Sequence, residues 1–199
     1  MSVVVAVKDN ENNCIWVGCD SKITAGNKIS YMDNNVTSKL WRLNDFTFVG
    51  GCGVGRDVQL VQTNEVIPSI FVETNSITFD WLVNGFFDNV YELLNEHHRG
   101  RITEGVIDDG CLMDEFIVRQ GDKCFAIDCS GYVEPIQDFL TIGSGGEVAY
   151  TYMSSHTDEP IVERITHAIE SASKLTAFVG GDIIIACTKM ELIEGDNEE

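Results

Sequence analysis

Three side chains near the start of the chain have types that together could activate a hydroxyl group. Ser2 follows the first methionine, Asp20 lies in the stretch GCDSK, and Lys39 lies in the stretch SKLWRL. A methionine before a small residue is usually trimmed, and trimming would leave Ser2 with both a hydroxyl and a free α-amine. A serine hydroxyl needs a base to become a nucleophile. An α-amine, with a pKa of roughly 8, can be that base, and a nearby ammonium lowers the pKa of the amine further.

Each of these residues also has a purely structural interpretation. Asp20 fits an ordinary turn, and Lys39 fits a surface lysine whose stem covers apolar neighbours. A Ser-His-Asp triad is not favoured, because nothing in the sequence organises the four histidines, which are His97, His98, His156 and His167.

Two glycine clusters follow strand-like segments, GGCGVG at residues 50–55 and GSGG at residues 143–146. The first has the spacing GxGxG instead of the dinucleotide-binding GxGxxG, and it lacks a P-loop lysine. Nucleotide binding is therefore disfavoured. The alternative is that these glycines bring a backbone N–H close to a reacting carbonyl group, as in an oxyanion hole.

The composition predicts one globular domain over residues 1–199, with a short acidic tail at about residues 191–199. The formal net charge of −19 opposes binding to nucleic acid. The sequence shows neither a membrane-length apolar run nor a secretory signal, which predicts a cytoplasmic protein without membrane association. Seven cysteines without a framework spacing are expected to be reduced thiols.

Two cysteine pairs, Cys14 with Cys19 and Cys124 with Cys129, are each five positions apart in strand-like segments. Residues five apart on a strand point to opposite faces, so neither pair is expected to bind a metal ion.

Apolar patterning predicts strands and helices in separate blocks. Residues 2–7 and 14–19 are expected to form one hairpin, and residues 29–32 and 38–43 a weaker one. The other expected strands are residues 46–50, 115–119, 123–129 and 182–188, and residues 132–135 are expected to be a strand or a turn. The expected helices are residues 56–64, 79–99, 148–154 and 158–175, the last one capped by Asp158, and residues 141–147 are expected to be a loop. This order predicts an α+β fold with helices outside two packed antiparallel sheets.

Six blocks, taken in order, resemble the proteasome β-subunit family, and within it the bacterial HslV peptidase. They are SVVVAV, GCDSK, SKLWRL, FVGGCGVGRD, LTIGSGG and VGGDIIIACT. The resemblance implies the four-layer αββα sandwich of N-terminal nucleophile (Ntn) hydrolases. It also implies hydrolysis of peptide bonds by the residue at the amino end.

The resemblance also implies a role for five residues. Ser2 matches the nucleophile, and Asp20 matches the acidic residue of the family's turn. Lys39 matches the lysine that lowers the pKa of the amine. Gly53 matches the glycine whose N–H stabilises the oxyanion, and Ser144 matches a serine that hydrogen-bonds near the terminal amine.

The sequence departs from the family at several positions. The nucleophile is serine instead of threonine, so it lacks the methyl group that restricts χ1. Thr176 and Val179 stand where proteasome subunits usually carry Asp and Ser, which favours the HslV-like branch. The resemblance implies that no cofactor is required. In the HslV-like branch, backbone carbonyls can hold a monovalent cation, and the matching residues here are Gly181, Ile184 and Cys187.

Family members act as rings on protein or peptide substrates with an ATP-driven unfoldase, so the resemblance implies a homo-oligomeric ring and such a partner. Retention of Met1 would remove the free amine of Ser2. Two alternatives follow: a proteasome-like structural or interaction protein without activity, and an amidase on the same fold that does not cut peptides.

Overall fold

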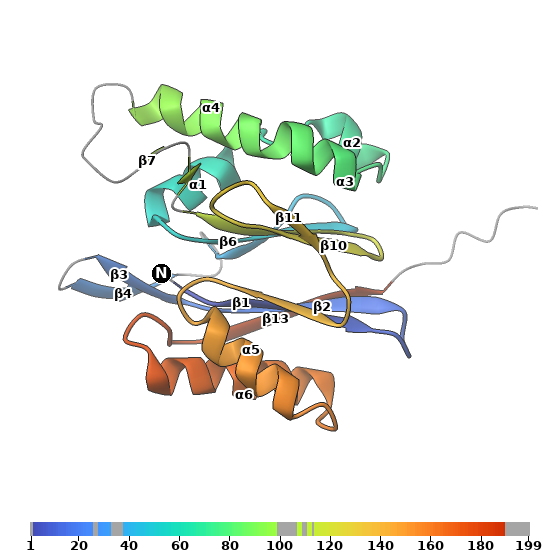
Figure 1. Cartoon of the computed structure of the whole chain (residues 1–199), viewed down its shortest axis with the longest axis vertical. Helices are drawn as coiled ribbons and strands as arrows, with labels where there is room; N and C mark the ends of the chain where they lie inside the picture. The colour runs from blue at the N-terminus through green and yellow to red at the C-terminus, as the bar shows by residue number, and fades with distance from the viewer. Residues whose placement is uncertain are drawn as a thin grey trace, which may run out of the picture.

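Two antiparallel sheets lie face to face between two layers of helices (Figure 1). This computed structural model describes residues 2–25, 28–32, 38–98, 107–108, 111–112 and 114–189. The predicted α+β sandwich with the layer order αββα is confirmed. The acidic tail at residues 191–199 lies outside the described residues.

The first sheet carries the beginning of the chain. Its strands are ordered β12 (Phe139–Ile142), β1 (Val4–Asp9), β2 (Cys14–Asp20) and β13 (Ile183–Lys189). The sheet is covered on both faces, because Val4 and Ala6 pack between the two sheets while Val5 and Val7 pack against helices. Burial on both faces explains why β1 is a continuous apolar run instead of an alternating one.

The second sheet consists of five strands. Their order is β11 (Val133–Pro135), β10 (Lys123–Ile127), β9 (Glu115–Gln120), β6 (Thr47–Cys52) and β5 (Leu40–Arg42). Two short strand pairs lie apart from both sheets, β3 (Lys22–Ala25) with β4 (Lys28–Tyr31) and β7 (Ile107–Asp108) with β8 (Cys111–Leu112).

Helices cover the outer face of each sheet (Figure 1). The second sheet is covered by α1 (Gly55–Thr63), α2 (Ser69–Glu73), α3 (Phe79–Trp81), a π-helical turn (Leu82–Phe86) and α4 (Phe87–His98). The first sheet is covered by α5 (Gly146–Ser155) and α6 (Ile161–Leu175). Within the described ranges, the helices are too short or too polar to cross a bilayer.

Three local predictions are wrong. Strand β4 pairs with β3 instead of residues 38–43, and β5 pairs with β6. Residues 139–142 form β12, because they pair with β1 from the far end of the sequence. Helix α6 begins after Pro160, whose ring favours the first turn, so Asp158 does not cap it.

The two cysteine pairs do not form metal sites. Cys19 lies in the core between the sheets, whereas the Cys14 thiol lies 3.9 Å from Oδ2 of Asp9, whose other oxygen holds the β1–β2 turn. Cys124 packs between the sheets, and Cys129 follows β10 at an exposed position. Cys14 and Cys19 therefore point to opposite faces of β2, as strand alternation predicts. Cys124 lies in β10, whereas Cys129 lies beyond the end of that strand.

Two residues of α6 test the packing of this helix on the first sheet. Ile169 is 1% exposed in the core, and Val162 is 41% exposed on the same helix. We expect Ile169→Ala to lower the free energy of unfolding by about 2–5 kcal/mol, because it leaves a cavity. Val162→Ala should change it by less than about 0.5 kcal/mol. Equal effects in urea titrations would contradict this packing.

Candidate active site

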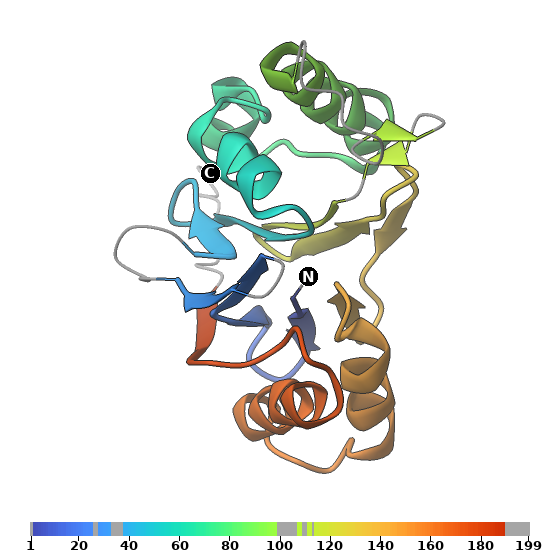
Figure 2. The ribbon, with the colours of Figure 1, turned by 90° about the vertical axis from the view of Figure 1, so that its left-hand side faces the viewer.

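Ser2 is buried at the point where β1 begins. It is 4% exposed, and its carbonyl oxygen accepts a hydrogen bond from the Gly145 N–H at 3.1 Å. The Ser144 hydroxyl also points to this oxygen, at 3.5 Å. Figure 2 shows the start of β1 near the centre of the molecule, between the two helical layers. The loop at residues 143–146 therefore holds the residue that would become the amino end.

Asp20, the last residue of β2, accepts hydrogen bonds from three backbone N–H groups and one side chain close to Ser2. It is fully buried. One carboxylate oxygen accepts the Val3 N–H at 3.0 Å and the Lys39 ammonium at 2.7 Å. The other accepts the Gly180 N–H at 3.0 Å and the Lys22 N–H at 3.3 Å. A buried carboxylate needs such partners to offset its lost hydration.

Lys39 lies inside the molecule and not on its surface. Its side chain is 3% exposed, and it lines one small cavity together with Ser2. The alternative of a surface lysine is therefore wrong. The other lining residues of this cavity come from the β3–β4 region, the first glycine cluster and α1; they are Lys22, Ile23, Thr24, Met32, Gly51, Gly53, Gly55 and Val58.

Two glycines adopt conformations that other residues rarely adopt, one on each side of Ser2. Gly53 has φ +142°, and a Cβ atom there would lie 1.9 Å from Oδ1 of Asp114. Gly143 has φ +90°, and a Cβ atom there would lie 2.4 Å from the carbonyl oxygen of Ser2. Both glycine clusters thus bring the backbone close to Ser2.

Two adjacent acids were missed by the sequence analysis. Asp114 accepts the Val54 N–H at 2.7 Å, and Glu115 accepts the Gly143 N–H. Asp114 is 1% exposed, and burial together with the nearby carboxylate of Asp57 raises its pKa to about 7. The available signal was a pair of acids just before an apolar strand, MDEFIV, and that pattern is also common in ordinary turns.

Other candidate nucleophiles and bases do not compete with Ser2. The buried Cys52 thiol lies next to Gly143, but burial raises its pKa, so it stays protonated and inert. In the described part of the chain, no histidine lines the cavity. His167 instead lies 3.1 Å from Glu159 near the α5–α6 turn.

The predicted cation ligands do not fit a single ion. Gly181 precedes β13, whereas Ile184 and Cys187 lie three residues apart within it and pair regularly with β2. Successive carbonyls of a strand point in opposite directions, so those of Ile184 and Cys187 face opposite edges. The described side chains also form no cluster of three or more metal-binding groups.

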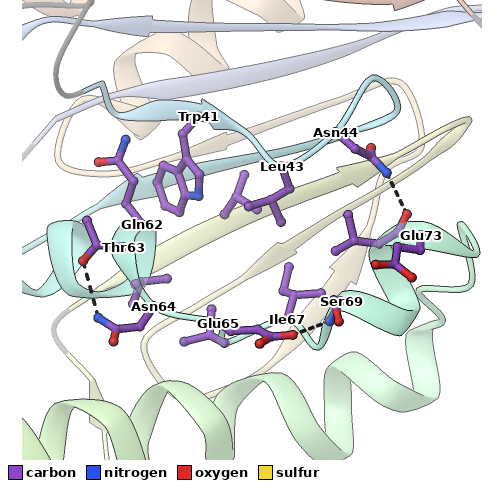
Figure 3. Close-up of a pocket in the computed structure, with 14 residues that line it drawn as sticks. Trp41, Leu43, Asn44, Gln62, Thr63, Asn64, Glu65, Ile67, Ser69 and Glu73 are labelled. Atoms are coloured by element: carbon purple, nitrogen blue, oxygen red, sulfur yellow. Dashed lines mark hydrogen bonds between the residues drawn. The ribbon is translucent and has the colours of Figure 1, made fainter.

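A second pocket, lined by both apolar and polar side chains, lies elsewhere on the second sheet (Figure 3). It has a volume of about 440 Å³ and is bordered by Trp41 and Leu43 on one side and by residues 61–73 on the other. It shares no lining residue with the cavity at Ser2. It is therefore not part of the site built by Ser2, Asp20 and Lys39.

The pair formed by Lys39 and Asp20 can be tested through stability. We expect Lys39→Met to lower the free energy of unfolding by about 3–5 kcal/mol, because it leaves a buried carboxylate without its cation. The control is Lys174→Met, which removes an exposed lysine 3.9 Å from Glu170 and should cost less than about 1 kcal/mol. Similar losses for both variants in urea titrations would contradict the buried pair.

The raised pKa of Asp114 predicts a pH dependence of stability. Between its ordinary value of 3.8 and about 7, the folded state keeps a proton that the unfolded state has released. The contribution of Asp114 to stability should therefore fall as pH rises through this window and stay constant above it. Asp114→Asn should remove this dependence. Parallel curves of unfolding free energy against pH for the two proteins would show that the Asp114 pKa is not raised.

Comparisons with known proteins bear on the fold. Among solved structures, BPH from Thiobacillus denitrificans matches with a TM-score of 0.69 and 16% identity over 96% of this chain and 100% of that chain. BPH in complex with epoxomicin matches with a TM-score of 0.68 and 15% identity over 95% and 99%. Eukaryotic HslV from Trypanosoma brucei matches with a TM-score of 0.66 and 18% identity over 94% and 99%.

These identities are low, so the structural matches show the fold alone. No curated protein matches the sequence. The model of one protein family, described as proteasome subunit, matches residues 2–187. This match covers both sheets, both helical layers and all five residues that the resemblance assigned to the site. The chain belongs to the proteasome subunit family.

Proposed function

We propose that the protein is a peptidase that uses Ser2 as its nucleophile after removal of Met1. The observation that supports this most directly is the shared cavity of Ser2 and Lys39, in which Asp20 holds both Lys39 and the backbone next to Ser2. These groups are buried, and the family match adds the precedent of a peptidase fold.

The proposed reaction begins with transfer of the proton of the Ser2 hydroxyl to the α-amine of the same residue. The oxygen attacks the carbonyl carbon of the substrate and forms a tetrahedral intermediate. In this scheme the N–H of Gly53 donates to the oxyanion. The ammonium then returns the proton to the leaving amine as the peptide bond breaks. A water molecule, deprotonated by the same amine, hydrolyses the ester and frees Ser2.

In this scheme, three residues set the protonation state and the position of the amine: Lys39, Asp20 and Ser144. The positive charge of Lys39 disfavours protonation of the amine and keeps it available as a base. Asp20 fixes Lys39 and the Val3 N–H, so the start of β1 cannot shift relative to the ammonium. Ser144 and Gly145 hold the Ser2 carbonyl from the opposite side.

The proposal includes assembly. HslV-like neighbours and the family match favour a homo-oligomeric ring that encloses its sites and receives protein or peptide substrates in the cytoplasm, from an ATP-driven unfoldase. Size-exclusion chromatography with light scattering tests the ring, because a monomer would elute with the mass of one 22.0 kDa chain. A monomeric mass at micromolar concentration would contradict this part of the proposal.

The nucleophile is tested with two substitutions at one position. Ser2→Ala keeps a small second residue, so Met1 is still trimmed, but it removes the hydroxyl. We expect peptide hydrolysis to fall by a factor of at least about 1,000. Ser2→Thr keeps the hydroxyl and should retain activity. Rates are measured with fluorogenic peptides on protein whose amino end is established by intact mass.

The outcomes separate the alternatives. Equal activity of wild type and Ser2→Ala would exclude Ser2 as the nucleophile. Hydrolysis of small amides without any peptide turnover would identify the amidase alternative. Full retention of Met1, with no turnover of either substrate class, would support the structural or interaction protein.

A further inference from the structure

The two glycine loops beside Ser2 are each held by one of two consecutive acids. Asp114 accepts the N–H of Val54, in the loop that contains Gly53. Glu115 accepts the N–H of Gly143, in the loop that contacts Ser2. Glu115 is the first residue of β9, in the second sheet, and Asp114 directly precedes it, whereas Ser2 lies just before β1 of the first sheet. One short segment therefore reaches both sides of the site.

The strand geometry explains how adjacent residues reach different loops. Glu115 pairs with Cys52 in the β6–β9 ladder, which places the start of β9 directly beside the first glycine cluster. Neighbouring side chains of a strand point to opposite sides. Asp114 turns toward Gly53 and Val54, and Glu115 turns toward Gly143.

The contacts at both loops are close. The Cβ position of Gly53 would lie 2.8 Å from the Cα atom of Asp114, and that of Gly143 would lie 2.8 Å from Sγ of Cys52. Asp114 and Asp57 are both fully buried, and Asp114 lies against the loop that contains Gly53. Burying two carboxyl groups is costly, so their position calls for a reason other than packing.

We propose that Asp114 and Glu115 are positioning residues that fix the two glycine loops relative to Ser2. This inference rests on the proposed peptidase function. Asp114 fixes the Gly53–Val54 peptide and with it the direction of the neighbouring Gly53 N–H. Glu115 fixes the Ile142–Gly143 peptide, and through it the Gly145 N–H that holds the Ser2 carbonyl. Neither acid touches the substrate in this scheme.

The kinetic test removes each acceptor and then restores it. We expect Asp114→Ala and Glu115→Ala, in protein that lacks Met1, to lower kcat about 10- to 100-fold with KM changed less than about twofold. Asp114→Asn and Glu115→Gln keep an acceptor oxygen and should recover most of the activity. The control is Glu134→Ala, an exposed acid on β11 of the same sheet, which should change neither constant.

A transition-state analogue separates positioning from general damage. A peptide boronate forms a tetrahedral adduct with a hydroxyl nucleophile, so its inhibition constant should weaken in the alanine variants by about the same factor as kcat/KM. If the two alanine variants keep kcat within about twofold of the Glu134→Ala control, the proposal is overturned. If Asp114→Ala does not fold, as judged by near-UV circular dichroism, the Glu115 variants decide the kinetic test.

Hydrogen exchange tests the positioning without reference to activity. We expect faster exchange of the peptide that contains Val54 in Asp114→Ala, and of the peptide that contains Gly143 in Glu115→Ala. The Glu134→Ala control should match wild type. If these changes occur but wild type hydrolyses nothing, the peptidase proposal fails and the positioning role stands. If wild type is active but exchange at both loops is unchanged, the positioning role is wrong.

Discussion

The buried carboxylate of Asp20 is the interaction on which the geometry of the site depends. It accepts hydrogen bonds from four segments: the starts of β1 and β3, the residue before β5, and the loop before β13, which lies 160 residues away. A carboxylate in this position has lost its water, and the four donors replace that hydration. The segments must therefore close around Asp20 for the cavity at Ser2 to exist.

The site is shared between the two sheets. Ser2 and Asp20 come from the first sheet and its edge. The first glycine cluster comes from β6 of the second sheet and the loop after β6, and the two acids lie where β9 begins. The packing of one sheet on the other consequently sets the distance between Ser2 and the first glycine cluster. For the proposed peptidase this means that the core that stabilises the fold would also fix the reacting groups.

The sequence predicted the local elements better than their partners. The β1–β2 hairpin and helix α6 follow from apolar runs and a helical stripe, which depend on neighbouring residues only. Strand β12 and the β5–β6 pairing were missed, because short strands carry little periodicity and β12 pairs with residues more than 100 positions away. Residue types alone made Ser2, Asp20 and Lys39 candidates, but the roles of all five residues depended on the resemblance, since spacing alone does not place Lys39 beside Asp20.

The role of Asp114 could be predicted neither from local patterns in the sequence nor from the resemblance. Its contact with Val54 spans 60 residues, and an acid before a strand is an ordinary feature of turns. Only the fold shows that this acid is buried beside a second carboxyl group, next to a glycine that leaves no room for a side chain.

The central claim is that the hydroxyl and the amine of one residue act together. The most direct measurement is tandem mass spectrometry of the amino-terminal peptide after reaction with a peptide epoxyketone, which presents electrophilic carbons to both groups. We expect an adduct on Ser2 in chains that lack Met1 and none in chains that retain it. An adduct on another residue, or an equal yield in both populations, would contradict it.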